Sequence, residues 1–422
     1  MASLPFIPYF TLITLLISFA YSSDTETSPQ TLLLSSDEQE SAYQVLESVN
    51  SLIDWRSLFP DDLCYSGPHG LVCDYFVDEN GNGSFHITEL SFGYVSEYSS
   101  NPPCSFNATF SPSLTSFSYL KKLFFYKCFA GTEIWLPGYF SNLSSTLEEL
   151  VFIENPSLFG TLNGKIGNLT SLRRLVLTGT NVSGNIPDEI GDLLDLEQIT
   201  VTRNRLNGEL PVSIGKLKKL KVLDLSLNGF EGDLPDSIGG ITELLKLDLG
   251  SNRFSGKIPK SFVGLQRLEF LDLSWNRFGN YGVPLFLSEM QSLKEVYLSG
   301  NQLGGQIPEI WEKMGGILGL GLSGLGLVGK IPSSMGVFLR NVCFLGLDNN
   351  TLEGNVPEEF GLLESVHELN LENNKLSGRI RLPLSAKFGG KIKLKGNNGL
   401  CVDGEEFRGS DKNRADLRYR ED

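Results

Sequence analysis

The hydrophobic positions of this chain follow one spacing over most of its length. The stretch 220–235 reads LKVLDLSLNGFEGDLP, with leucine at its first, fourth and sixth positions and asparagine at its ninth. The same frame starts again at Leu244 and Leu268, and it also starts upstream at Leu172 and Leu196. Because the side chains of a strand point alternately to its two faces, we expect the leucines of the central LxL inside and the intervening residues outside.

Eleven copies of this frame occur, most of them 24 or 25 residues apart, and we number them as coils one to eleven. Their first positions are Leu120, Leu147, Leu172, Leu196, Leu220, Leu244, Leu268, Leu293, Ile317, Val342 and Val366. This period and pattern are typical of the leucine-rich repeat, whose coils stack because no coil can bury its leucines alone. We therefore predict an α/β repeat fold, a curved leucine-rich-repeat solenoid with a parallel sheet on its concave face. The repeats are expected to fill residues 118–388, and a partial coil with a polar tail is expected over 389–422.

Four coils depart from the pattern, and coils one and three do so by placing Cys128 and Thr180 where asparagine belongs. In regular coils an asparagine such as Asn228 leaves the strand and can bond the backbone of the following turn. Coil nine has Leu325 at that position, so we expect the asparagine ladder to break there. Coil seven departs after Phe278, where GNYGVPLF replaces the usual GxIP.

A cap region is predicted over residues 23–117. Apolar residues recur at helical spacing after Ser36, which predicts a helix over 37–58. Cys64 and Cys73 bracket a short loop, and in an exported chain this spacing indicates a disulfide. The disulfide-bearing cap would cover the apolar end of the solenoid.

The pairing of the other cysteines is open. We favour a disulfide between Cys104 and Cys128, which would tie the cap to coil one. The alternative is that Cys128 is a buried free thiol, because the repeat accepts asparagine or cysteine at its position. We expect Cys343 and Cys401 to stay unpaired.

The start of the chain indicates export. The nearly unbroken apolar run 4–20 predicts a signal peptide over residues 1–22, with a retained anchor as the alternative. We find no later apolar run of membrane-spanning length and expect a secreted, extracellular mature chain. Six sequons can accept glycans in such a chain. They are Asn82, Asn107, Asn142, Asn168, Asn181 and Asn349.

Charge and motifs narrow the chemistry. The net charge of −15 argues against nucleic acid or an anionic membrane as the main partner. The loop 78–89 matches the calcium loop of an EF-hand, but its flanks resemble strands and its Asn-Gly pairs favour a hairpin. We therefore expect no metal site.

No enzyme motif is supported either. The glycines of 319–324 match GxGxxG but fall in phase with the repeat, whereas a dinucleotide site needs a helix after them. The three histidines, His69, His86 and His367, lie far apart in sequence, and we find no nucleophile or metal-ligand spacing that connects them. We expect no cofactor and no catalytic activity.

A binding site is predicted on the concave face. Coil nine presents only glycines between aromatic residues of neighbouring coils, and bare backbone beside aromatic walls can admit a peptide main chain. The residues proposed for it are Phe270, Trp275, Tyr297, Gly319, Gly321 and Phe344. The alternative is that these are scattered surface aromatics. The nearby aspartates Asp224, Asp248 and Asp272 are ordinary residues for the strand of such a repeat.

Residues outside the repeats carry a resemblance. Trp55, the segment 69–73, the segment 90–93, the segment 123–128 and the closing 397–401 are similar to plant extracellular leucine-rich-repeat receptor-like proteins. That resemblance implies no kinase of its own, a place at the plasma membrane, and signalling through a partner receptor kinase. The family's second cysteine and apolar tail do not follow here, so secretion is expected, with a place at the outer face of the plasma membrane as the alternative.

We therefore expect a non-enzymatic recognition module. It would bind a peptide or protein ligand and act with a receptor-like kinase or co-receptor ectodomain, in development or in the response to microbes. The alternative is a secreted structural or cell-wall-associated protein, including an inhibitor of a secreted enzyme, with no signalling partner.

Overall fold

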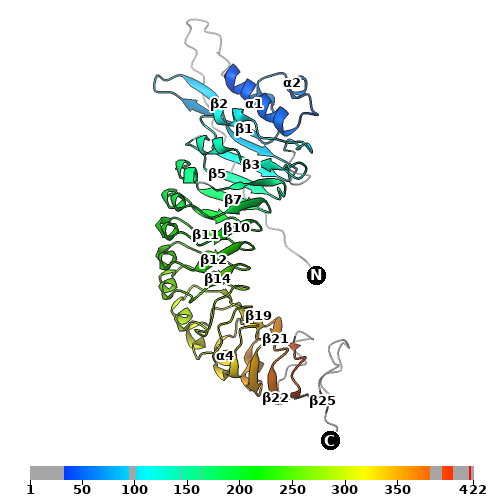
Figure 1. The fold of residues 1–422 in the computed structure, drawn as a ribbon, viewed down its shortest axis with the longest axis vertical. Coiled ribbons are helices and arrows are strands. Elements are labelled where there is room, and N and C mark those ends of the chain that lie inside the picture. The colour runs from blue at the N-terminus through cyan, green and yellow to red at the C-terminus, as the bar shows by residue number, and fades with distance from the viewer. Residues whose placement is uncertain are drawn as a thin grey trace, which may run out of the picture.

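The chain folds into a long curved stack of coils, as the repeat predicted (Figure 1). The computed structural model describes residues 33–94, 101–143, 145–162, 164–380, 392–402 and 418–419. The predicted signal peptide and most of the predicted polar tail lie outside these residues. Within the described ranges, no helix combines the length and the apolar composition that a membrane span requires.

The concave face is a single sheet of 14 strands. Its first two strands, β1 (Leu71–Val77) and β2 (Gly83–Phe92), form an antiparallel hairpin, and every later strand pairs in parallel with the strand of the preceding coil. The later strands are β3 (Lys122–Tyr126), β5 (Glu149–Ile153), β7 (Arg174–Thr178), β9 (Gln198–Thr200), β11 (Val222–Asp224), β13 (Lys246–Asp248), β15 (Phe270–Asp272), β16 (Glu295–Tyr297), β17 (Gly319–Gly321), β19 (Phe344–Gly346), β21 (Glu368–Asn370) and β23 (Ile392–Lys393).

Two further sheets line the flank where each coil turns back. The first contains β4 (Ile134–Trp135), β6 (Leu158–Thr161), β8 (Asn181–Gly184), β10 (Arg205–Gly208), β12 (Gly229–Asp233) and β14 (Arg253–Ser255). The second contains β18 (Val328–Lys330), β20 (Thr351–Gly354), β22 (Lys375–Ile380), β24 (Gly399–Val402) and β25 (Arg418–Tyr419).

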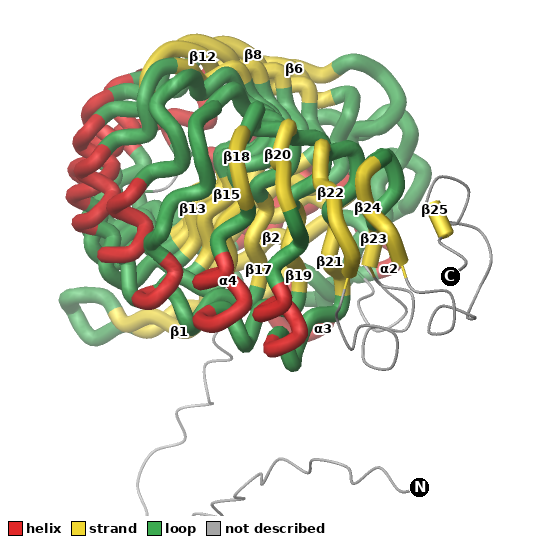
Figure 2. The backbone as a smooth tube through the Cα atoms, turned by 90° about the horizontal axis from the view of Figure 1, so that it is seen from below, coloured by secondary structure: helices red, strands yellow, loops and turns green. Residues whose placement is uncertain are grey.

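Helical turns close the coils and stack along one side of the solenoid (Figure 2). All but one of them are 3-10 turns. They are η1 (Pro112–Ser116), η2 (Gly138–Asn142), η3 (Gly164–Asn168), η4 (Asp188–Asp192), η5 (Val212–Lys216), η6 (Asp236–Gly240), η7 (Lys260–Gly264), η8 (Leu285–Glu289), η9 (Trp311–Lys313), α4 (Ser333–Phe338) and η10 (Glu358–Leu362).

The core is a continuous column of inward side chains. Leu223 and its equivalents in the next two coils are fully buried. Phe230, Phe254 and Phe278 stack from coil to coil with ring centroids 6.0 and 6.5 Å apart. Burying one leucine or phenylalanine contributes about 1.5–3 kcal/mol, so each coil gains stability only when its neighbour is folded.

The asparagine ladder joins the coils through buried hydrogen bonds. The Asn252 amide donates to the carbonyls of Leu225 and Leu249 at 3.0 and 3.1 Å, and its oxygen accepts the N–H of Phe230 at 3.1 Å. Each ladder asparagine therefore satisfies backbone groups of its own coil and of the coil before it. The predicted break at coil nine is confirmed, because Leu325 takes the place of asparagine and donates its own N–H to Asn350 at 3.0 Å.

The cap differs from the sequence prediction in its helix. The predicted helix over 37–58 is two helices, α1 (Ser36–Val49) and α2 (Trp55–Leu58), and a third, α3 (Leu63–Ser66), follows. The first one ends because Asn50 adopts an extended backbone, and its side chain donates to the carbonyl of Pro103 at 2.9 Å. Leu52, which the helical spacing placed on the apolar face, is instead exposed.

Two disulfides hold the cap. One joins Cys64 to Cys73 and the other joins Cys104 to Cys128, so Cys128 is not the free thiol that the sequence also allowed. Cys343 is unpaired, and so is Cys401.

Removing a ladder asparagine should destabilise the solenoid. In Asn252→Ala the buried carbonyls and the N–H of Phe230 lose their partner, and we expect unfolding to become easier by about 2–4 kcal/mol. Chemical denaturation of the purified chain measures this. Asn341→Ala is the matched control, since its amide makes one exposed hydrogen bond, to Gly315 at 3.0 Å. Equal losses in the two variants would contradict the ladder's role.

Candidate functional site

The concave face presents columns of side chains that run from coil to coil. The strand register aligns the outward residues of successive strands in two columns. The first contains Lys246, Phe270, Glu295, Gly319, Phe344 and Glu368. The second contains Asp248, Asp272, Tyr297, Gly321, Gly346 and Asn370.

Three rings form an aromatic row, which we define as Phe270, Tyr297 and Phe344. The ring centroid of Tyr297 lies 5.8 Å from that of Phe270 and 6.2 Å from that of Phe344. All three side chains are half-buried. The Tyr297 hydroxyl donates to Glu295 at 2.8 Å, and burial together with this carboxylate raises the pKa of Tyr297 above its usual value.

The glycines of coil nine do not form an open notch. A Cβ atom added to Gly319 would lie 2.5 Å from the Tyr297 hydroxyl, and one added to Gly321 would lie 2.8 Å from the Tyr297 ring. Both glycines are buried, so the expected floor of bare backbone is covered by the Tyr297 ring. The structure thus brings Phe270, Tyr297, Phe344 and the two glycines together, and their role in ligand binding stays a prediction.

Trp275 follows the strand of coil seven, five residues after Phe270 of the aromatic row. Its side chain is 66% exposed, and its backbone has φ of 54°. The left-handed region is uncommon for so bulky a residue. The backbone N–H of Trp275 donates to the carbonyl of Ser299 at 2.7 Å. A Cβ atom added to Gly300 would lie 2.7 Å from the Trp275 indole. The indole therefore lies against the glycine of the next coil and presents an apolar surface to solvent.

An acidic column adjoins the aromatic row, and we define it as Asp224, Asp248 and Asp272. In the sequence these aspartates are ordinary for such a strand, but the structure places one cation beside two of them. Lys246 lies 2.6 Å from Asp224 and 3.4 Å from Asp248. Burial lowers the pKa of Lys246, but the hydrogen bonds and charges of Asp224 and Asp248 together outweigh it, so the pKa is raised.

One lysine does not neutralise three carboxylates. Burial, together with the charges of Asp224 and Asp272, raises the pKa of Asp248 to about 6. Asp272 accepts the N–H of Ser274 at 2.8 Å and has no cationic partner within the described ranges. The acidic column therefore carries uncompensated negative charge at neutral pH, which a basic group could relieve.

A hollow lies on the concave face of the first coils, and it was not predicted from the sequence. It has a volume of about 620 Å³, with Phe124, Val151 and Val176 among its lining residues. An ion pair between Arg174 and Glu149, 2.9 Å apart, adjoins these apolar residues. The sequence does contain a signal for this hollow. The column of Asp248 and Asp272, followed upstream of coil four, consists of apolar residues.

A cluster in the cap brings a hydroxyl, a histidine and a carboxylate together. Ser84 lies 2.9 Å from the Nε2 atom of His86, and the Nδ1 atom of His86 lies 2.9 Å from Glu38. The other oxygen of Glu38 accepts the N–H of Ile87 at 2.8 Å, and the His86 ring stacks on Tyr119 at 4.0 Å. These contacts join helix α1 to strand β2, and we interpret the cluster as part of the cap packing.

The calcium-like loop is a hairpin turn, as its Asn-Gly pairs predicted. It connects β1 to β2. The Asp78 carboxylate accepts the N–H groups of Asn80 and Asn82 at 2.9 and 2.7 Å. The oxygen that would begin a calcium site is thus used inside the turn.

The sequons differ in exposure. Asn181 is half-buried and its amide donates to the carbonyl of Pro156. The other five asparagines are exposed, namely Asn82, Asn107, Asn142, Asn168 and Asn349. Accessible amides favour these five as glycan acceptors, and their use stays a prediction.

The fold and its capped, disulfide-bonded start define a leucine-rich-repeat solenoid protein. The family descriptions "Leucine rich repeat" match residues 218–278 and 292–314. The chain resembles plant leucine-rich-repeat receptor-like proteins. It is 34% identical over 138 residues to Protein TOO MANY MOUTHS of Arabidopsis thaliana, covering 32% of this chain and 26% of that protein.

A second relative has the same level of identity. Piriformospora indica-insensitive protein 2 of Arabidopsis thaliana is 34% identical over 162 residues, covering 37% of this chain and 34% of that protein. The matched segments thus span about a quarter to a third of the relatives' own lengths.

Solved structures share the architecture. The ectodomain of the membrane receptor kinase GASSHO1/SCHENGEN3 from Arabidopsis thaliana, in complex with CASPARIAN STRIP INTEGRITY FACTOR 2, aligns with a TM-score of 0.57 and 26% identity. That alignment covers 74% of this chain and 40% of the receptor chain. A plant ice-binding protein aligns with a TM-score of 0.56 and 21% identity over 87% of this chain and 96% of its own. At that identity only the fold is shared.

Neutralising Asp248 should stabilise the chain at neutral pH. The pKa of Asp248 is about 6 in the folded chain against 3.8 as its ordinary value, so the folded state holds a proton that the unfolded state has released. Stability therefore falls as the pH rises from about 4 to about 6, and the full penalty remains above that range. We expect Asp248→Asn to match the parent at pH 4 and to exceed it by about 1–3 kcal/mol at pH 7.

Denaturant unfolding of both proteins at the two pH values measures the difference. Asp188→Asn, which removes an exposed carboxylate from a helical turn, is the control. A gain for Asp248→Asn that is as large at pH 4 as at pH 7 would contradict the argument.

Proposed function

We propose that this chain is an extracellular receptor-like protein that binds a peptide ligand on its concave face and acts with a partner receptor kinase. The observation that carries the proposal is the continuity of the acidic column with the aromatic row. The strand register places Asp248 and Asp272 beside Phe270 and Tyr297 on adjoining strands. An extended peptide lying across these strands could bring a basic side chain to the acids and an apolar one to the rings.

The charges support a basic residue in the ligand. Lys246 shows how an ammonium group fits between Asp224 and Asp248, and a ligand cation beside Asp272 would extend the same arrangement. A charge-assisted hydrogen bond to a partly buried carboxylate is stronger than one between neutral groups. Because binding a cation lowers the pKa of Asp248, the ligand should bind more tightly at pH 7 than at pH 5.

The partner kinase rests on resemblance. The relatives are receptor-like proteins, and the resemblance to them implies that this chain has no kinase of its own. Ligand binding would therefore need another protein to pass the signal across the membrane. A receptor kinase ectodomain is the partner that this family resemblance implies.

A structural or inhibitory role is the alternative. The ice-binding protein shares the fold, so the fold alone does not choose between recognition and a structural role. The discriminating features are the ligand-facing charges and a kinase partner. A wall-associated protein would bind polymer without needing either.

Removing two carboxylates should weaken peptide binding. We expect Asp248→Asn combined with Asp272→Asn to lower binding to arginine-containing peptides at least tenfold, because two charge-assisted contacts are lost. The measurement is an array of random twelve-residue peptides probed with the purified chain at pH 7 and pH 5. The matched control is Asp188→Asn with Asp236→Asn, which removes equal charge from helical turns η4 and η6.

The aromatic side of the site is tested separately. Trp275→Ala with Tyr297→Ala should weaken the same peptides, whereas Tyr297→Phe keeps the ring over the glycines and should preserve binding. If the double alanine variant folds and binds as tightly as the parent, the peptide site lies elsewhere, for example at the hollow of the first coils.

The partner is tested by direct binding. The purified chain should bind at least one member of a panel of purified receptor kinase ectodomains, more tightly when an array-selected peptide is present. Retention by cell-wall polysaccharide with no ectodomain binding would favour the structural alternative.

A further inference from the structure

The flank of the solenoid is interrupted at coil seven. The first flank sheet ends with β14 in coil six, and the second begins with β18 in coil nine. Between them, the flank of the described chain has no strand and forms only two isolated β-bridges, Gly279 with Gln302 and Gln306 with Val328. The interruption coincides with the segment that departs from the repeat after Phe278.

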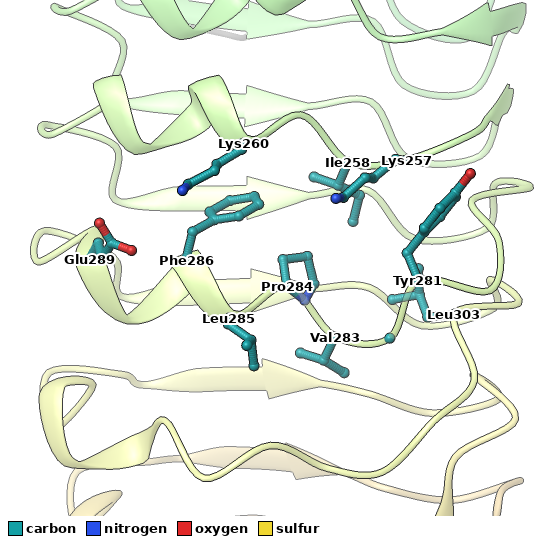
Figure 3. A pocket seen from close by; sticks show the side chains of 11 residues that line it. Lys257, Ile258, Lys260, Tyr281, Val283, Pro284, Leu285, Phe286, Glu289 and Leu303 are labelled. Carbon is teal, nitrogen blue, oxygen red and sulfur yellow. The ribbon is translucent and has the colours of Figure 1, made fainter.

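A pocket of about 320 Å³ lies at this interruption (Figure 3). Its apolar lining comes from coils six, seven and eight. It consists of Ile258, Val283, Pro284, Leu285, Phe286 and Leu303. Tyr281 and Leu285 at its rim are 64% and 65% exposed. The volume lies at the lower end of the range for small-molecule sites.

Two lysines without acidic partners border the pocket. Within the described part of the chain, neither Lys257 nor Lys260 has a carboxylate within ion-pair distance. By contrast, Lys294 of coil eight pairs with Glu269 of coil seven at 2.7 Å. Lys257 instead lies 5.7 Å from the ring centroid of Tyr281.

The two ends of the pocket differ in charge. Figure 3 shows Lys257 near Tyr281 at one end, and Lys260 with Glu289 at the other. The Glu289 carboxylate disfavours an anion at its own end, so an anionic group would be held best by Lys257. On a chain with a net charge of −15, this is a local site of the opposite sign.

We propose that this flank pocket binds a compact ligand in which a carboxylate is joined to an apolar body. The carboxylate pairs with Lys257 beside Tyr281, and the apolar body packs on Pro284 and Phe286. A free small acid and the carboxy-terminal residue of a peptide share this chemistry. The site does not depend on the concave-face peptide, because its residues come from the flank loops and helical turns rather than from the concave sheet.

The apolar floor and the cation act together. Burial of a ligand ring removes apolar surface from water, at about 25 cal/mol per Å². An ion pair at a partly exposed site contributes less by itself, but it selects the anion over a neutral ligand of the same shape. The expected signature is therefore a preference for the acid over its amide that depends on Lys257.

The test uses three probes that differ only in their end group: 3-phenylpropionate, 3-phenylpropanamide and 3-phenylpropylamine. Ligand-observed NMR titration of the purified full chain measures each dissociation constant. We expect the acid to bind at least tenfold more tightly than the amide, and the amine to bind most weakly. Equal binding of acid and amide would overturn the proposal.

Variants locate the site. Lys257→Gln should abolish the preference for the acid, and Glu289→Gln should increase acid binding about twofold, while Lys216→Gln on the turn η5 should change nothing. Acid binding that persists unchanged in Lys257→Gln would overturn the assignment. Because Lys257 is a surface residue, the thermal unfolding midpoint of Lys257→Gln should match that of the parent. This measurement separates a loss of binding from a loss of folding.

A peptide arm separates the two ligand sources. The tetrapeptide Gly-Ser-Gly-Phe is compared with a free and with an amidated carboxyl terminus. Tight binding of the free form alone supports a peptide end as the occupant, and binding of 3-phenylpropionate without the tetrapeptide supports a free acid. If neither acid binds up to millimolar concentration, the proposal fails, whatever the outcome at the concave face.

Discussion

The structure depends on the fact that a coil cannot satisfy itself. Its inward leucines need the leucines of the next coil, and its turn carbonyls need the asparagine of the next coil. Asn252 illustrates this, because one side chain bonds carbonyls of coil five and of its own coil. Apolar burial and hydrogen bonding therefore repeat with the same period, and the strand spacing of about 4.8 Å fixes the rise from coil to coil.

The same dependence explains which positions can vary. An outward residue contacts solvent or the neighbouring columns rather than the core, so its identity can change while the inward packing stays the same. The concave face can therefore be apolar at Val151, acidic at Asp248 and aromatic at Tyr297 while the backbone keeps one register. Stability and recognition are thus assigned to opposite faces of the same short strand.

How far the sequence alone predicted the structure follows from this separation. The coils, the two columns and the ladder break at Leu325 depend on inward and register positions, which the period determines. The covering of Gly319 by Tyr297 depends on a rotamer, and no spacing encodes it. The contact of His86 with Glu38 joins segments far apart in the chain, so it depends on the packing of the cap. The end of the first helix at Asn50 was not predicted for a related reason, because the Asn50 side chain donates to the carbonyl of Pro103 in a distant loop.

The charge of the acidic column shows why residue type alone misled. Aspartate is ordinary in such a strand, and each of the three residues is unremarkable in its own coil. Stacking them at the strand spacing is what changes their chemistry. Carboxylates in adjoining strands share one lysine, and burial raises the cost of the remaining charge. A property that belongs to three coils at once cannot be read from any one of them.

Coil seven shows a second way in which a repeat protein gains a site. On the concave face, the proposed peptide site arises from substitution at outward positions with the backbone unchanged. On the flank, the backbone itself departs after Phe278, and the loss of a paired strand opens a pocket. A substituted face suits an extended ligand that contacts several coils, whereas a pocket between strands suits a compact one. The stacked core tolerates both, because Leu271 and Phe278 keep their buried places in the same coil.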